Sequence, residues 1–323
     1  MPPLSEVVDA LMKVVLPASI ATAVAFALVA RLATGRGSLA AAALALAVGF
    51  VAGNHLRGAV EFRLDSERLL TPGELGRAFW DSLVPPQAED APIPPAPRYW
   101  IPWTAGLALL GGIAAGAVHP AAAWSIRMAF SGLAAAMAVS ADLRQSLPWL
   151  VPLLFVVILV EWTVFERLGQ AEMRGKEPKP DDRGQPGYSW LFPVTACATF
   201  LAASVVLLHA HSARFVDIAT IMAACLGTIA VVGWLLKAST SGAAPGAAVV
   251  LPALMLSGQQ DTFSEVPNAS FALVALAPVT LTPLIWPRLR NSRRATALVL
   301  AAFAGVVMLG TALAVRAESL SFY

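Results

Sequence analysis

The sequence predicts an all-α fold, a polytopic membrane helix bundle of about ten transmembrane helices. Of its 323 residues, 58% are hydrophobic and 13% are charged, whereas an average soluble domain has about 25% charged residues. The mean hydropathy is correspondingly high, at +0.70. These values argue against an ordinary soluble domain and make the lipid bilayer the first expected partner.

Ten apolar runs account for the expected helices, because a helix needs about 20 apolar residues to cross the hydrocarbon core of a bilayer. The run at 243–258 is the weakest, since it is short and contains Pro245, Gly246 and Pro252. If that run is re-entrant, the number of crossings falls to nine and the C-terminus changes side. In chain order the runs lie at 14–32, 38–56, 100–118, 121–141, 147–165, 189–209, 215–236, 243–258, 269–287 and 295–315.

The runs divide the chain into a first transmembrane hairpin at 1–56, an extramembrane loop at 57–99 and the main transmembrane bundle at 100–323. The loop contains a short amphipathic helix in which Thr71 is the expected N-cap and Glu74 its capping-box partner. A proline-rich stretch then favours an extended linker. We expect the short helix to rest on the bundle or on the membrane interface.

Lysine and arginine are unevenly divided between the two sides of this arrangement, and cytoplasmic loops normally carry the excess. Thirteen of the 22 fall on one side, and four of them form a cluster at 288–294 that contains no acidic residue. We therefore expect this cluster in the cytoplasm, and both termini and the long loop outside. The abundance of arginine, alanine, glycine and proline is typical of a GC-rich bacterial genome and predicts a multi-pass protein of the bacterial inner (plasma) membrane.

Helices 3–5 and 6–8 show signs of an internal repeat. In the last helix of each set a proline precedes an acidic residue by nine positions, as in Pro152 with Glu161 and Pro252 with Asp261. Because each set has an odd number of helices, the two would cross the membrane in opposite senses, as the inverted repeats of secondary transporters do. The competing explanation is that the proline-rich loops and tryptophans before each set serve only as interfacial anchors.

The candidate functional residues are polar groups inside or beside the apolar runs. A carboxylate at the bilayer centre costs roughly 2.5 to 3.5 kcal/mol and often marks an ion path or a partner. Prolines also break the two helices between 243 and 287, which exposes backbone groups. In the structural alternative, Glu161 reaches the interface from a nearby helix end and Asp261 belongs to an exposed turn. The candidates are Glu161, Gln259, Gln260, Asp261 and Glu265.

The sequence contains no recognisable motif for catalysis, metal binding or a cofactor. It has no Walker loop, nucleophile elbow, paired-histidine zinc motif or Cys-x-x-Cys. His209 and His211 are two residues apart, which directs their side chains away from a common metal on a helix. Cys197 and Cys225 lie in separate apolar runs, where thiols behave as small hydrophobes. A net charge of +2 gives no reason to expect nucleic acid as a partner.

The leading functional hypothesis is a non-catalytic structural or accessory component of a membrane protein assembly, with a membrane-protein partner or further copies of the chain. The alternative is a secondary transporter or permease for a small solute or ion. An internal polar cavity that reaches both Glu161 and residues 259–265 would favour the transporter. The accessory hypothesis rests on sparse polar groups and on three glycine pairs that allow close helix packing: Gly49 with Gly53, Gly112 with Gly116, and Gly242 with Gly246.

The orientation can be tested by labelling single cysteines with a membrane-impermeant maleimide in intact cells. We expect Ser82→Cys to react from outside, because it lies in the long loop, and Ser292→Cys to react only after the cells are opened. The unsubstituted chain is the control for labelling of Cys197 and Cys225. Labelling of Ser292→Cys in intact cells would reverse the predicted orientation.

Overall fold

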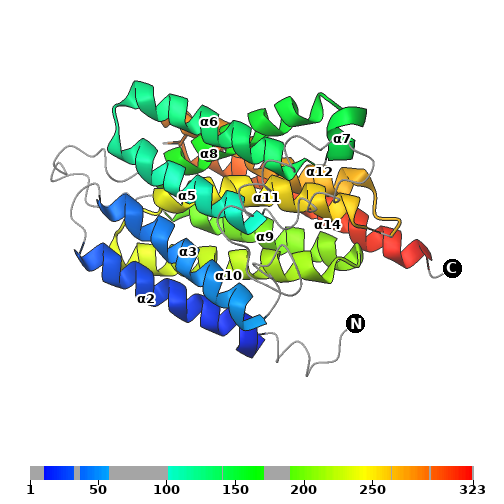
Figure 1. Ribbon diagram of the computed structural model, residues 1–323, viewed down its shortest axis with the longest axis horizontal. Coiled ribbons are helices and arrows are strands. Elements are labelled where there is room, and N and C mark those ends of the chain that lie inside the picture. Colours follow the sequence, from blue (N-terminus) through cyan, green and yellow to red (C-terminus); the bar gives the residue numbers. More distant parts are fainter. Residues whose placement is uncertain are drawn as a thin grey trace, which may run out of the picture.

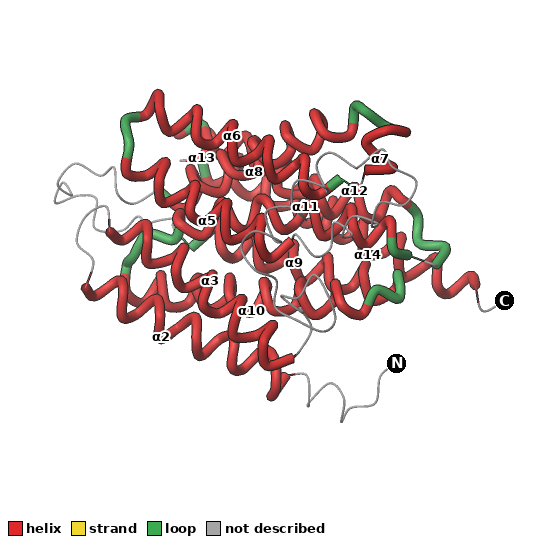
Figure 2. Tube along the Cα trace, viewed as in Figure 1, coloured by secondary structure: helices red, strands yellow, loops and turns green. Residues whose placement is uncertain are grey.

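The computed structural model is a bundle of helices that run side by side along its longest axis (Figure 1). All regular structure among the described residues is helical, as Figure 2 shows. The amphipathic helix and the linker expected in the 57–99 loop lie outside the described residues. The structure describes residues 11–32, 37–57, 101–139, 141–170, 190–262, 264–290 and 292–321.

Helical segments cover all ten predicted apolar runs. Two short helices that the sequence did not indicate, α7 (Ala141–Ser146) and α13 (Pro287–Arg290), precede α8 and α14. The main segments are η1 (Leu11–Val15) with α2 (Leu16–Leu32), α3 (Gly37–Arg57), α5 (Ile101–Ala117), α6 (Pro120–Ala138), α8 (Leu150–Gly169), α9 (Leu191–His209), α10 (Ala213–Leu236), η4 (Ser241–Ala243) with α11 (Ala244–Gln260), α12 (Asn268–Leu276) with η5 (Ala277–Ile285), and α14 (Arg293–Ser321).

Among the described residues, five segments are long and apolar enough to cross a membrane, which indicates a membrane protein. The apolar stretches of α2, α3 and α5 are shorter, and α8 carries Glu161, Glu166 and Arg167. The predicted count of ten crossings is therefore not confirmed. The five segments are Leu191–His209, Phe215–Leu236, Ser241–Gln260, Asn268–Ile285 and Arg293–Ala317.

The segment Ser241–Gln260, which contains α11, lies at the centre of the bundle. Within its most apolar 18-residue window, 94% of the residues are buried, and α5, α8, α9 and α12 pack around it. Its residues are small or apolar on every side, as expected for a helix with no solvent-facing surface. Pro245 occupies the first turn, where a proline costs no helical hydrogen bond. The re-entrant alternative is thus not what the structure shows, because the weakest predicted run forms a helix of membrane-spanning length.

By contrast, α14 lies on the outside of the bundle. Only 17% of the residues in its most apolar 18-residue window are buried. Large apolar side chains stand out along its length: Leu298 is 72% exposed, Met308 69% and Leu309 52%. Exposed leucines and valines on α2, α3, α9 and α10 continue this surface. Large exposed apolar side chains on five helices fit lipid rather than water as the surroundings.

Neighbouring helices alternate in direction, so their termini collect at two ends of the bundle. Gly169, the last residue of α8, lies against the backbone of Ser241, where the central segment begins. At the other end, the Thr262 hydroxyl, just after α11, donates a hydrogen bond to the Ala210 carbonyl, just after α9. α8 and α11 are therefore antiparallel.

We call the end that contains Gly169 and Ser241 the basic end. It also holds Arg167, Lys237 and the arginines of 288–294, whereas α14 ends at the opposite end (Figure 1). The first described turn, η1, lies at that opposite end as well, because α2 and α3 pair along their lengths and α3 begins beside η4. The first and last described residues, Leu11 and Ser321, therefore lie at the end opposite the arginine cluster. Which end faces the cytoplasm stays a prediction.

The predicted inverted repeat is not confirmed. Its two sets correspond to α5, α6 and α8, and to α9, α10 and α11. Their last helices differ in environment, since α11 is enclosed while α8 presents Leu153 and Val156 to the exterior at 48% and 52% exposure. The helix α7 also interrupts only the first set. The opposite directions of α8 and α11 are required by the repeat, but they also follow from simple alternation of the helices along the chain.

Small residues allow the close helix packing that the glycine pairs predicted. A Cβ atom on Gly112 would overlap the ring of Pro245, and one on Gly246 would lie 3.0 Å from Leu109, so both glycines hold α5 against α11. Gly49 similarly faces the Thr22 hydroxyl on α2. At Gly169 the nearest atoms belong to the backbone and cannot rotate away, since an added Cβ would lie 2.7 Å from the Cα atom of Ser241.

Replacing Gly112 by alanine tests this packing. We expect Gly112→Ala to lower the melting temperature in detergent, with a cost of about 1 to 3 kcal/mol from overpacking against the Pro245 ring. The matched control is Gly106→Ala in the same helix, where no atom lies within 4 Å of the added Cβ. That control should stabilise the helix by up to about 1 kcal/mol. Equal effects of the two substitutions would contradict the close contact.

Candidate functional site

Glu161 lies near the middle of α8. The helix runs from Leu150 to Gly169, so eight residues follow Glu161 before the helix ends. At about 1.5 Å per residue, the carboxylate is about 12 Å from that end along the helix axis. Its side chain is 0% exposed. The structural alternative from the sequence, in which Glu161 reaches the interface from a nearby helix end, is therefore wrong.

The carboxylate of Glu161 has no hydrogen-bond partner among the described residues, at either oxygen. Its neighbours along the helix are large and buried, with Ile158, Trp162 and Phe165 each at most 1% exposed. Burying an unpaired charge in apolar surroundings costs far more than burying a neutral group. The charged form of Glu161 is therefore costly in these surroundings, because no described residue offsets its charge.

The helical spacing of α8 shows which neighbours Glu161 meets. Leu150, Leu154 and Val157 form a stripe that faces α11 and α12, and Glu161 continues the stripe by one further turn. Beyond α12 the chain continues directly into η5, which also packs against α8. Glu161 is therefore placed at the level of η5 and the middle of α11.

The segment η5 is an unusual element for the interior of a membrane bundle. It is a 3₁₀-helix of nine residues, whereas runs longer than three or four residues are uncommon and often mark a hinge or a functional site. Pro278 and Pro283 remove two backbone donors from it. The Thr280 and Thr282 hydroxyls donate to the backbone carbonyls of Ala277 and Val279. Their oxygen atoms keep acceptor capacity for a cation or a proton donor.

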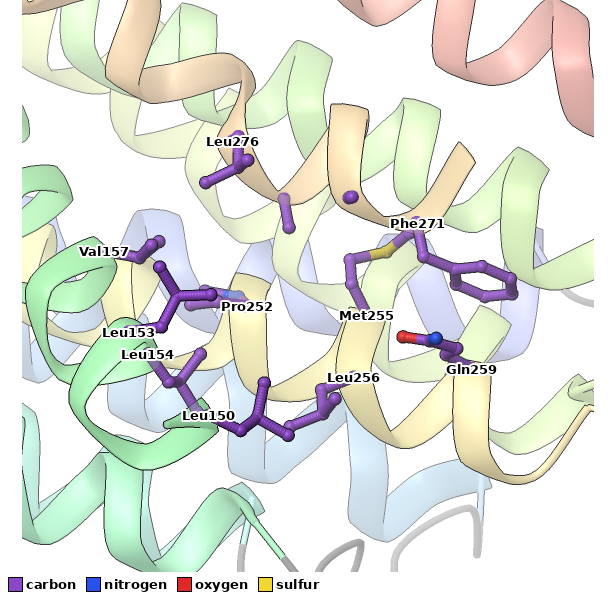
Figure 3. Close-up of a pocket in the computed structure, with 12 residues that line it drawn as sticks. Leu150, Leu153, Leu154, Val157, Pro252, Met255, Leu256, Gln259, Phe271 and Leu276 are labelled. Carbon is purple, nitrogen blue, oxygen red and sulfur yellow. The ribbon is translucent and has the colours of Figure 1, made fainter. Parts of the chain in front are cut away.

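A cavity of about 130 Å³ opens between the first half of α8, the second half of α11 and α12. Figure 3 shows Gln259 and Phe271 at one end of this cavity, away from Val157. Gln259 is its one polar lining residue, and Glu161 does not line it. This cavity therefore does not form the polar connection between Glu161 and residues 259–265 that would have favoured a transporter outright.

The other four candidates gather at the end of the bundle opposite the basic end. Gln259 is half-buried, Gln260 and Glu265 are exposed, and Asp261 is half-exposed in the bend after α11. Their loop is held by the Thr262 hydroxyl, which pairs with Ser264 at 2.8 Å and with the Ala210 carbonyl at 3.1 Å. This position agrees with the simpler reading of Asp261 as a turn residue.

The structure does not bring Glu161 and Asp261 together. The antiparallel packing sets Asp261 at the level where α8 begins, eleven residues before Glu161. That spacing corresponds to roughly 16 Å along the axis of the bundle. Of the five candidates, Glu161 is the one that is both buried and without a partner.

One polar cluster was missed from the sequence. The Arg127 guanidinium on α6 pairs with the Glu166 carboxylate on α8 at 2.7 Å, and the Gln170 amide donates to the same oxygen at 2.7 Å. Arg127 also lies 5.4 Å from the ring centroid of Trp124. No spacing rule joins residues 39 positions apart. The sequence did contain one signal. Arg127 lies near the start of one apolar run and Glu166 near the end of the next, so the two opposite charges fall at the same end of two antiparallel helices.

This ion pair distinguishes the surroundings of Glu166 from those of Glu161, the other glutamate on α8. Glu166 lies five residues after Glu161 and is compensated by Arg127, with 17% and 13% of the two side chains exposed. It ties α6 to α8 near the basic end. Glu161 is fully buried and has no such partner among the described residues.

The described residues contain no group of three or more His, Cys, Asp or Glu that could hold a metal ion. His211 is exposed and lies in a left-handed turn with φ of 57°. The cysteines Cys197 and Cys225 are free. No family model matches the chain, and comparisons with curated proteins and with solved structures give no match.

The cost of the unpaired carboxylate can be measured through stability. We expect Glu161→Leu to raise the melting temperature in detergent, because it removes a buried polar group that costs about 1 to 3 kcal/mol when unsatisfied. Glu166→Leu is the matched control in the same helix. It should lower the melting temperature, because it leaves the Arg127 guanidinium without its partner. Destabilisation by Glu161→Leu would show that the native carboxylate is satisfied.

Proposed function

We propose that the protein is a secondary transporter or permease for a small cation or a proton-coupled solute, with Glu161 as the group that binds the cation or proton. The observation that carries the proposal is the complete burial of Glu161 at mid-helix, with both oxygens unpartnered. An ionisable residue inside a membrane bundle is costly, and its retention is best explained by function.

The surroundings of Glu161 support this proposal. Discontinuous helices in transporters supply backbone carbonyls for cations near the middle of the membrane, and η5 is such an irregular segment beside α8. The central helix also contains a proline at position 252 within a fully buried stretch. Glu161, the hydroxyl oxygens of η5 and its backbone carbonyls are oxygen ligands of the kind that hard cations prefer.

The accessory role in a membrane protein assembly is the second candidate. It is favoured by the outer helix α14, whose large apolar side chains offer a face for another membrane protein or a further copy of the chain. The apolar lining of the cavity beside Gln259 also fits this role. A bacterial inner-membrane location, with the arginine cluster in the cytoplasm, applies equally to both candidates.

Reconstitution tests the proposal directly. The purified chain is placed in liposomes that contain a pH-sensitive dye, and proton movement is followed after proton, sodium and potassium gradients are imposed in turn. We expect cation-dependent or proton flux with the wild type and none with Glu161→Gln, because the amide cannot bind or release a proton. Glu166→Gln is the matched control and should retain flux. Full flux through Glu161→Gln would exclude the carboxylate-coupled mechanism.

A chemical test does not depend on knowing the solute. Dicyclohexylcarbodiimide reacts with protonated carboxyl groups in apolar surroundings, so it should modify Glu161, and mass spectrometry of the peptide would locate the adduct. We expect the transported cation to protect Glu161 from modification. Modification of Glu265 without modification of Glu161 would favour the accessory role, since it would show that Glu161 is not a protonated carboxyl group that the reagent can reach.

A further inference from the structure

A strongly basic surface lies where α13 gives way to α14. We call it the arginine patch and define it as Arg288, Arg290, Arg293 and Arg294. Arg288, Arg293 and Arg294 are exposed, and Arg290 is partly buried. Among the described residues no acid pairs with any of the four, and the Nε atom of Arg290 is buried without a hydrogen-bond partner. Within the part of the chain that the structure describes, the positive charge of the patch is therefore uncompensated.

The position of two of these arginines at the start of α14 strengthens the positive electrostatic potential of the patch. Arg293 and Arg294 occupy the first turn of the helix, where the free N–H groups form the positive end of the macrodipole and acidic residues are normally favoured. Ser292 caps this end, since its hydroxyl accepts a hydrogen bond from the N–H of Ala295 at 3.4 Å. Two cations beside a positive helix end repel each other and the helix end, and an external anion relieves this repulsion.

Large apolar side chains flank the patch on both sides. Trp286 is 58% exposed, Leu289 39% and Leu298 72%. Leu298 follows Arg294 by four residues, so about 6 Å along the helix separates the basic surface from the lipid-facing surface. An exposed tryptophan at this level is typical of the boundary between the hydrocarbon and the headgroups of a bilayer. The guanidinium groups therefore lie at headgroup depth.

From this juxtaposition we propose that the arginine patch binds the phosphate headgroups of anionic phospholipids. Guanidinium groups pair with phosphate in a bidentate manner, and clustered basic residues beside a membrane helix bind anionic lipids. The adjoining apolar surface of Leu289 and Leu298 distinguishes a lipid from a free anion, because it accommodates the upper part of the acyl chains. This inference does not depend on the transport role of Glu161.

The test measures the melting temperature of the full chain in a mild neutral detergent. It compares additions of phosphatidylglycerol, phosphatidylcholine with the same acyl chains, and inorganic phosphate. We expect phosphatidylglycerol to raise the melting temperature by several degrees, an effect that 0.5 M salt, at a Debye length of roughly 4 to 5 Å, should suppress. The two other additions should have little effect. Equal shifts from both lipids, or from phosphate alone, would overturn the proposal.

Paired variants locate the effect within the molecule. Arg293→Gln with Arg294→Gln should weaken the apparent affinity for phosphatidylglycerol by at least about tenfold, and it leaves Arg288 and Arg290 to preserve orientation. The matched control removes two other exposed charges at the basic end, through Arg31→Gln with Lys237→Gln, and should keep the wild-type affinity. An equal loss in both pairs would assign the effect to general surface charge and overturn the assignment to the patch.

A charge-conserving variant separates loss of lipid binding from misfolding or altered membrane orientation. Arg293→Lys with Arg294→Lys keeps both positive charges and therefore the expected membrane orientation. We expect it to bind phosphatidylglycerol more weakly than the wild type and more strongly than the glutamine pair, because lysine lacks the planar fork of arginine. Unchanged binding by both the lysine and the glutamine pairs would show that the lipid binds elsewhere.

Discussion

Enclosure of the central helix is the constraint on which the rest of the bundle depends. The segment Ser241–Gln260 has almost no surface left for lipid or water, so its neighbours must approach it closely on every side. In a bilayer this approach relies on dispersion contacts between well-fitted surfaces, because lipid chains are as apolar as the side chains they replace. Small residues on α5, α8 and α11 therefore determine how the outer helices can be arranged.

Hydropathy was sufficient to predict the fold class, because transfer of apolar side chains from water depends little on their neighbours. The glycine pairs at Gly49, Gly112 and Gly246 likewise indicated real close contacts. Hydropathy could not rank the runs by burial, since lipid and a protein interior are equally apolar surroundings for a leucine. This is why Ser241–Gln260 looked like the weakest run and is in fact the central helix.

The candidate site was predicted in part. The sequence drew attention to Glu161 because a carboxylate is conspicuous in an apolar run. It did not show where α8 ends, so the distance of Glu161 from the end of the helix could not be predicted. The helix continues through Glu166 and Arg167 to Gly169, which places Glu161 well inside. Within this last part of the helix, Glu166 pairs with Arg127, 39 residues earlier. Pairing at that separation depends on the tertiary fold, which no local pattern encodes.

The contact between α8 and the central segment differs from one end to the other. At the basic end, Gly169 meets the backbone of Ser241 with no room for a methyl group, while at the other end a cavity separates α8 from α11 and α12. Free volume governs how far a protein interior can be compressed. A larger side chain in α8 therefore has room to be accommodated near Gln259, whereas near Gly169 it would have to push two backbones apart.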